Sequence, residues 1–79
     1  MSTKAYILIE TAVGKSRDVS AALQTLPGVT TVDPVTGPYD IIAVVEAQDL
    51  NAVGDLVTSQ IHTIGGIGRT VTCLSVGAS

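Results

Sequence analysis

The sequence predicts a small α+β domain whose secondary structure follows the order βαββαβ. Three observations lead to this prediction: apolar, β-branched segments typical of strands, two segments with apolar residues at helical spacing, and Gly or Pro residues between them. Two βαβ halves joined by a hairpin form the ferredoxin-like fold, in which two helices pack on one face of a four-stranded antiparallel sheet. The 79 residues leave no room for a second core, so we expect a single domain over residues 1–79.

The first half of the chain predicts a strand, a helix and a second strand. Residues 5–11 are rich in β-branched and apolar types, as strands are. Residues 14–26 carry apolar side chains at helical spacing and predict an amphipathic helix. The Pro-Gly pair at 27–28 ends this helix, because proline cannot continue it and glycine accepts left-handed backbone geometry. Residues 29–37 predict the second strand, where Pro34 indicates a bulge or an edge position.

The second half repeats this order after a turn. Residues 40–47 predict the third strand and contain the most apolar strand-like segment. Asp49 is a suitable N-cap for a helix over residues 50–64, where apolar side chains again keep helical spacing. The two glycines at 65–66 end this helix, and residues 67–76 predict the fourth strand.

Two of the predicted strands need an apolar neighbour on both faces of the sheet. Residues 6–9 and 41–45 are apolar at consecutive positions, whereas a strand with one wet face would alternate. The helices can cover only one face, and soluble monomers rarely expose an apolar patch as large as the other face would be. We therefore expect a homodimer at least, in which a second copy packs sheet against sheet.

The composition argues against nucleic acid and membrane as direct partners. The net charge is −3, and the four cations form no run that could neutralise a phosphate backbone. The longest apolar runs are about five residues, whereas a membrane span needs roughly twenty. A single cysteine, Cys73, cannot form an internal disulfide, so a cytoplasmic location is the simplest interpretation.

Catalytic, metal and cofactor sites find no support in the residue pattern. His62 and Cys73 are the only copies of their types, and no acidic residue, His or Cys stands at metal-ligand spacing from either. The segment "VGKS" at 13–16 ends like a phosphate-binding loop but has Ile9 where that motif needs its first glycine. We predict no enzyme activity, no catalytic residue, no metal and no cofactor.

The most unusual segment is "VTGPYD", residues 35–40, at the mouth of the third strand. It can serve purely as a hairpin turn, with Gly-Pro for the bend and Tyr39 over apolar surface. Alternatively, Asp40 and the backbone N–H groups of the turn can hold a small zwitterion, because a carboxylate accepts from an ammonium group and N–H groups donate to a carboxylate. Thr70 and Thr72 add two hydroxyls on one side of the fourth strand, although β-propensity alone also explains a Thr pair.

Taken together, these motifs resemble the effector domain of Lrp/AsnC transcription regulators, also called the RAM domain. The family pattern is an apolar-Pro-Gly-Val stretch, then Val-Thr-Gly-x-Tyr-Asp, a hydrophobic strand, a helix, and Gly-Val-x-Arg-Thr-x-Thr. Residues 26–29, 35–40 and 66–72 fill these positions. The resemblance is to the stand-alone form of the family, because the first strand begins at about residue 5 with no helix-turn-helix before it.

The resemblance implies binding of a small-molecule amino acid effector in a homo-oligomer, as dimers and rings of dimers, and full-length Lrp/AsnC regulators as partners. It also implies the binding residues, which are Gly37, Pro38, Tyr39 and Asp40 of one subunit with Thr70 and Thr72 of an adjoining subunit. Pro38 stands where the family has an acidic or small residue. Two alternatives remain at this stage: a purely structural oligomerisation module, and a dimeric α+β-barrel enzyme built on the same βαββαβ unit.

Overall fold

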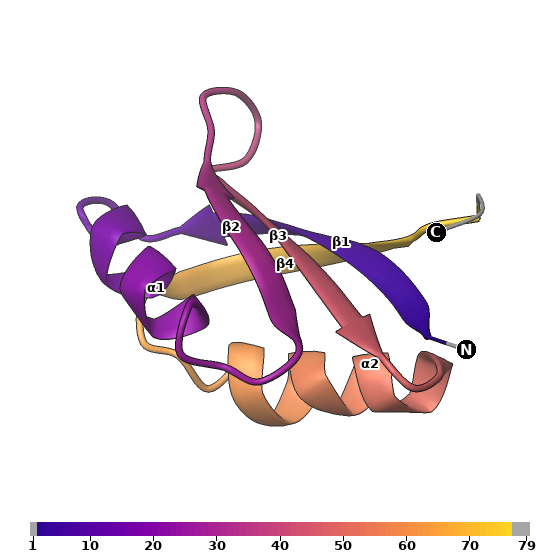
Figure 1. Ribbon diagram of the computed structural model, residues 1–79. Coiled ribbons are helices and arrows are strands. Elements are labelled where there is room, and N and C mark those ends of the chain that lie inside the picture. The colour runs from indigo at the N-terminus through magenta and orange to yellow at the C-terminus, as the bar shows by residue number, and fades with distance from the viewer. Residues whose placement is uncertain (1, 77–79) are drawn as a thin grey trace.

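The computed structural model describes residues 2–76, which form a four-stranded antiparallel sheet with two helices (Figure 1). The elements are β1 (Thr3–Thr11), α1 (Ser16–Leu23), β2 (Val29–Pro34), β3 (Ile41–Ala47), α2 (Leu50–Leu56), the π-helical segment η1 (Val57–Ile61) and β4 (Ile67–Leu74). The strands lie in the order β2-β3-β1-β4, so β1 and β3 are central and β2 and β4 are edges. The predicted ferredoxin-like α+β fold is confirmed.

The helices are shorter and less regular than the sequence predicts. The first was predicted over 14–26, but Gly14 takes a positive φ of 77° in a turn, and the chain after Leu23 forms turns that lead to Gly28. The second helix begins where predicted, because the Asp49 carboxylate accepts a hydrogen bond of 2.8 Å from the Ala52 N–H. Its last part is not α-helical but continues as η1.

The core lies between the helices and one face of the sheet. Alternate residues of the central strands are fully buried on this face: Ala5, Ile7, Ile9, Ile41, Ala43 and Val45. Residues of α1, α2 and η1 complete the cluster: Val19, Leu23, Val53, Leu56, Val57 and Ile61. The pattern shows that both helices cover the same face, as predicted.

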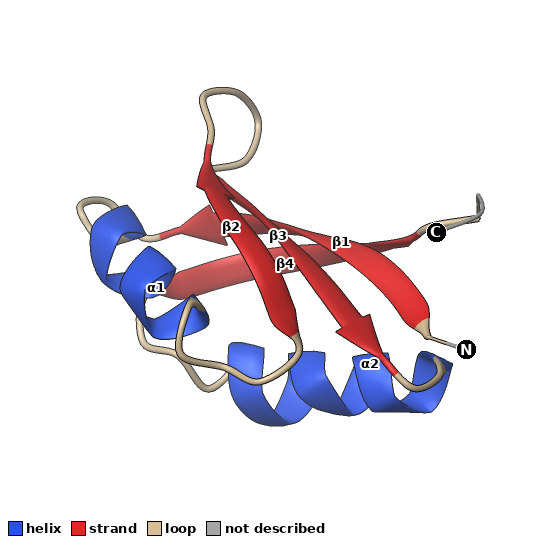
Figure 2. Cartoon of the chain, viewed as in Figure 1, coloured by secondary structure: helices blue, strands red, loops and turns tan. Residues whose placement is uncertain are grey.

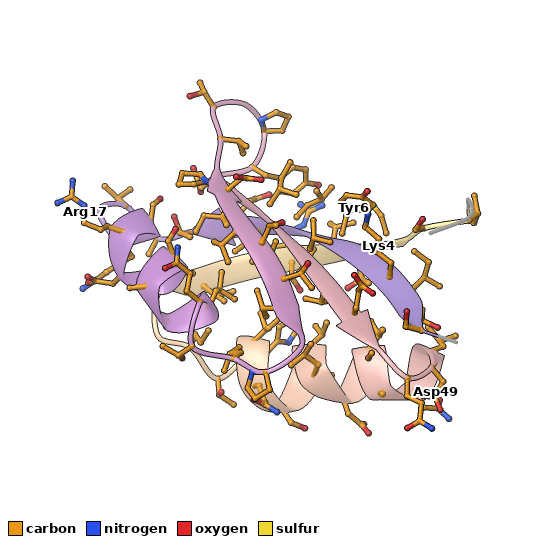
Figure 3. The ribbon with its side chains drawn as sticks, viewed as in Figure 1. Lys4, Tyr6, Arg17 and Asp49 are labelled. Atoms are coloured by element: carbon orange, nitrogen blue, oxygen red, sulfur yellow. The ribbon has the colours of Figure 1, made fainter. Side chains whose placement is uncertain are left out.

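The opposite face of the sheet, which we call the open face, has no helix over it. Its apolar side chains are Tyr6, Leu8, Ile42, Val44, Val71 and Cys73, and none of these six is fully buried. Lys4 lies beside Tyr6 at one end of this face (Figure 3), with its ammonium group 5.3 Å from the centre of the ring. The prediction that the central strands carry apolar residues on both faces is therefore confirmed, and the Cys73 side chain is exposed there.

The second strand ends earlier than the predicted residue 37. Pro34 is its last residue and lies on the edge strand β2, where its missing N–H group does no harm to the ladder. Residues 35–40 then leave the sheet as a loop that stands away from the body of the domain (Figure 2). This loop contains most of the predicted effector site.

Candidate functional site

The loop over residues 35–40 is closed at its base by backbone hydrogen bonds. The Val35 N–H donates to the carbonyl of Asp40 at 2.9 Å, and the Asp40 N–H donates to the carbonyl of Ile9 at 2.9 Å. The loop therefore projects from a fixed base on β1 and β3. Gly37 and Pro38 at its tip are exposed, whereas Tyr39 is half-buried where the loop returns to the sheet.

The Asp40 carboxylate is held in place by Thr11. Its Oδ2 accepts hydrogen bonds from the Thr11 N–H at 2.8 Å and from the Thr11 hydroxyl at 3.2 Å. The Thr11 hydroxyl also bonds the Ser16 hydroxyl at 2.8 Å, which ties the end of β1 to the start of α1. Within residues 2–76 no hydrogen bond reaches Oδ1 of Asp40, so one oxygen of a fixed carboxylate is available to a ligand.

Thr70 and Thr72 lie on one side of β4, as alternation predicts. They stand opposite Ile9 and Ile7, on the side of the sheet that carries the helices. The helices pack mainly over β1, β2 and β3, so this margin of β4 remains accessible. Thr70 is half-buried and Thr72 is exposed.

One residue beside this margin, His62, was not predicted as a site residue from the sequence. Nε2 of His62 lies 2.6 Å from the hydroxyl oxygen of Thr70, so the imidazole is hydrogen-bonded to a predicted site residue. The two residues line a hollow of about 360 Å³, together with Ile67, Gly68 and Arg69. The pattern of apolar residues showed only that residue 62 belongs near the end of a helix. No periodic signal marks its pairing with β4.

A larger hollow lies elsewhere and contains none of the predicted residues. It has a volume of about 750 Å³ and is bordered by α2, η1, the end of β3 and the turn before β2; Pro27, Glu46, Asp55 and Gln60 are among its lining residues. Pro27 and Gly28 in its lining belong to the motif at residues 26–29, but no residue of the predicted effector site lines this hollow.

The two parts of the predicted site do not meet within one subunit. Ile9 of β1 pairs with Ile41 on one side and with Thr70 on the other, so β1 runs between them. Adjacent strands are about 4.8 Å apart, which puts Asp40 and Thr70 roughly 10 Å from each other. Gly37, Pro38, Tyr39 and Asp40 thus form one group, and Thr70, Thr72 and His62 form another, at the same end of the sheet.

The described part of the chain shows neither a metal cluster nor a helix that spans a membrane. Across residues 2–76 there is no group of three or more His, Cys, Asp or Glu side chains that could hold a metal ion. None of the described helices is long and apolar enough to cross a membrane.

Comparison with known sequences gives these residues a context. The sequence model of the Lrp/AsnC ligand binding domain matches residues 4–78. An uncharacterized HTH-type transcriptional regulator of Pyrococcus horikoshii is 32% identical over 78 residues, which are 95% of this chain and 52% of the regulator. The chain spans about half the length of the curated regulators of three Pyrococcus species that it matches.

Solved structures share the fold over nearly the whole chain. A protein of Thermus thermophilus has a TM-score of 0.91 at 35% identity, covering 98% of this chain and 96% of that one. AsnC of E. coli has a TM-score of 0.91 at 25% identity, covering 96% of this chain and 52% of AsnC. A transcriptional regulator of Neisseria meningitidis, solved as an L-Met complex, has a TM-score of 0.86 at 18% identity, covering 95% and 50%. This last likeness concerns the fold alone.

Proposed function

The chain belongs to the Lrp/AsnC ligand-binding domain family, and from this membership we propose that it is a non-catalytic, regulatory sensor of amino acids. It acts in the cytoplasm as dimers and rings of dimers, alone or in mixed assemblies with full-length regulators of the family. The effector lies between subunits, with Gly37, Pro38, Tyr39 and Asp40 on one side and Thr70 and Thr72 on the other. The observation that carries this proposal is the separation of the two groups by β1 within a single subunit.

The chemistry of the two groups supports a zwitterionic effector. Asp40 offers an oriented carboxylate with one oxygen available, and an ammonium group is its natural partner. The β4 group offers hydroxyls and no carboxylate among the residues that line its hollow. An α-amino acid bridges such a pair of surfaces, with its ammonium at Asp40 and its carboxylate on the other subunit. The solved L-Met complex of the Neisseria regulator supports this class of effector.

The open face supports dimerisation through the sheet. Its six partly exposed apolar residues form one band across β3, β1 and β4. Charged side chains stand opposite each other at both ends of the band: Lys4 opposite Glu46, and Glu10 opposite Arg69. An apolar centre with a charged rim is the usual anatomy of an interface, and a second copy of the same face gives a closed two-fold dimer.

The effector site is tested by thermal unfolding in the presence of each of the twenty L-amino acids. A ligand at 100 times its dissociation constant stabilises the folded state by about 2.7 kcal/mol. Each kcal/mol raises the Tm of a domain of this size by roughly 4–8 °C, so a true effector raises Tm by on the order of 10 °C. If no amino acid raises the Tm of the folded oligomer, the sensor proposal is rejected. The chain would then be a structural oligomerisation module, in which the loop serves only subunit contact.

The role of Asp40 in binding is tested by Asp40→Asn. The amide oxygen still accepts from the Thr11 N–H, so the loop keeps its base while the charge is lost. We expect the effector-induced rise in Tm to disappear. Asp33→Asn removes the same charge from an exposed site on β2 and is the matched control, which should respond like the unmodified chain. An unchanged response of Asp40→Asn would refute the assignment.

The interface is tested separately by Val44→Glu. Val44 is half-buried on the open face, in the central strand β3. A carboxylate there would be buried without a partner in the dimer, so sedimentation velocity should show monomers. The control is Ala21→Glu on the exposed side of α1, which should sediment like the unmodified chain. Equal sedimentation of Val44→Glu and the unmodified chain would exclude this face as the interface.

A further inference from the structure

Two irregularities of the backbone border the hollow at His62 and Thr70. One is the π-helical segment η1, in which the His62 N–H donates to the carbonyl of Val57, five residues earlier, at 2.9 Å. The other is a β-bulge in β4, because Thr11 pairs with Ile67 while the preceding Glu10 pairs with Arg69. Gly68 is therefore the extra residue of the strand. Both kinds of irregularity occur often at functional sites.

The bulge determines which way Thr70 points. Ile67 packs against the core, on the side of the sheet that carries the helices. In a regular strand a residue three positions later points to the opposite face, since side chains alternate. The extra residue Gly68 shifts this alternation by one, so Thr70 stands opposite the buried Ile9 on the same side as Ile67. Without the bulge, the Thr70 hydroxyl would face away from His62.

The π-helical segment has the corresponding effect on His62. It keeps Val57 and Ile61 in the core while the chain turns toward β4 at the next residue. The imidazole therefore lies against the strand at the surface, and Nε2 is 2.6 Å from the hydroxyl oxygen of Thr70. Two separate departures from regular structure thus converge on one hydrogen bond that is not needed for the core, because His62 is exposed.

We propose that His62 is a binding residue of the effector site and that, with Thr70, it receives the carboxylate of the amino acid. This inference rests on the proposed function and adds to it the residue that selects for an anionic group. The bond between Nε2 and the Thr70 hydroxyl uses one donor of the pair, so the carboxylate must take the place of this bond. One carboxylate oxygen then accepts from the Nε2–H group of the imidazole and the other from the Thr70 hydroxyl. Arg69 lines the hollow as well, but its guanidinium is 3.7 Å from Glu10 on the other face of the sheet.

The chain offers a direct spectroscopic test, because His62 is its single histidine. The carbon-bound ring protons of His62 then give one set of imidazole signals in a proton–carbon NMR spectrum. The spectrum is recorded with each of the twenty L-amino acids and with the amide of every amino acid that raises Tm. We expect the His62 signals to shift with the amino acid and not with its amide, which lacks the carboxylate.

Variants of His62 test the same point by affinity. His62→Gln keeps a side chain that can hydrogen-bond to Thr70 and to a carboxylate, so affinity for the stabilising amino acid should stay within about threefold. His62→Phe keeps the bulk of the ring without its nitrogens and should lower affinity on the order of tenfold to a hundredfold. Ser59→Ala, on the same π-helical segment but lining the larger hollow, is the control and should not change affinity.

The outcomes separate this inference from the function on which it rests. If an amino acid raises Tm while the His62 signals stay fixed and His62→Phe binds normally, the sensor proposal stands and the role of His62 is wrong. If the amide shifts the signals as much as the amino acid does, His62 contacts the effector but does not read its carboxylate, and the inference is overturned. If no amino acid raises Tm, both proposals fall together.

Discussion

Replacing Gly66 by alanine provides a sharp test of how the start of β4 is positioned. Gly66 has a φ of +100°, in the left-handed region that side chains disfavour. A Cβ added there would lie 2.9 Å from Cβ of Lys15 and 3.1 Å from Cγ2 of Val19. Both atoms sit close to the backbone of α1 or in the core, so neither can swing away. The Gly66 carbonyl also accepts from the Ala12 N–H at 2.7 Å, which fixes the loop against β1.

The expected loss of stability has two parts. Left-handed geometry costs a residue with a side chain roughly 1–2 kcal/mol. Forcing an extra methyl group into a packed contact costs about 1–3 kcal/mol more. The free energy of unfolding of Gly66→Ala should therefore fall by roughly 2–5 kcal/mol, which lowers the Tm of a domain of this size by on the order of 10–40 °C.

The neighbouring glycine supplies the control. A Cβ at Gly65 meets no atom within 4 Å, and its φ is not in the left-handed region. Gly65→Ala should therefore change the free energy of unfolding by no more than about 1 kcal/mol. Both variants are compared with the unmodified chain by urea unfolding at one protein concentration, because an oligomer's apparent stability depends on concentration. Equal midpoints for the two variants would refute the geometry assigned to this loop.

Three further changes are predicted from individual contacts, all measured by urea unfolding. Asp40→Ala leaves the half-buried Thr11 N–H without its acceptor and should lower stability by about 1–3 kcal/mol. Asp40→Asn keeps an oxygen that can accept this hydrogen bond, so it should lose much less stability, and equal losses in the two variants would contradict the hydrogen bond. Asp49→Ala removes the N-cap of α2 and should lower stability by about 1 kcal/mol, so an unchanged midpoint would argue against the cap. Gly54→Ala should raise stability by about 0.5–1 kcal/mol, because alanine favours the helix and a Cβ added at this position would have no atom within 4 Å. A loss of stability would mean that another group lies closer to this position than the structure shows.

The sequence predicted the fold well where a regular period could be read. Consecutive β-branched and apolar residues identified the two strands that lie at the centre of the sheet. The open face followed because two helices can cover only one of the two apolar faces. Pro34 on an edge strand and Asp49 as an N-cap are both confirmed, because each depends on a local property of one residue type. The helix ends were less well predicted. Residues 24–26 have suitable types for a helix but are drawn into the turn that leads to Gly28.

The candidate site was predicted only in part. Asp40 and Tyr39 drew attention as polar and aromatic residues in a turn, and their place at the strand mouth is confirmed. The hydrogen bond between His62 and Thr70 could not be foreseen, because it depends on an added residue in η1 and on the bulge at Gly68. Patterns with a period of 3.6 or 2 residues describe regular helices and strands. They carry no information on where that regularity is interrupted.

The separation of Asp40 from Thr70 by β1 has a thermodynamic consequence for the proposed sensor. If each effector contacts two subunits, its binding and the association of those subunits are linked, and each must strengthen the other by the same factor. The open face and the β4 margin are different surfaces, so a dimer can persist through the first while the effector acts on contacts made through the second. An amino acid would then change the balance between dimers and larger rings, without any rearrangement of the fold itself. In the proposed sensor, the concentration of a small molecule would thereby be converted into a state of assembly.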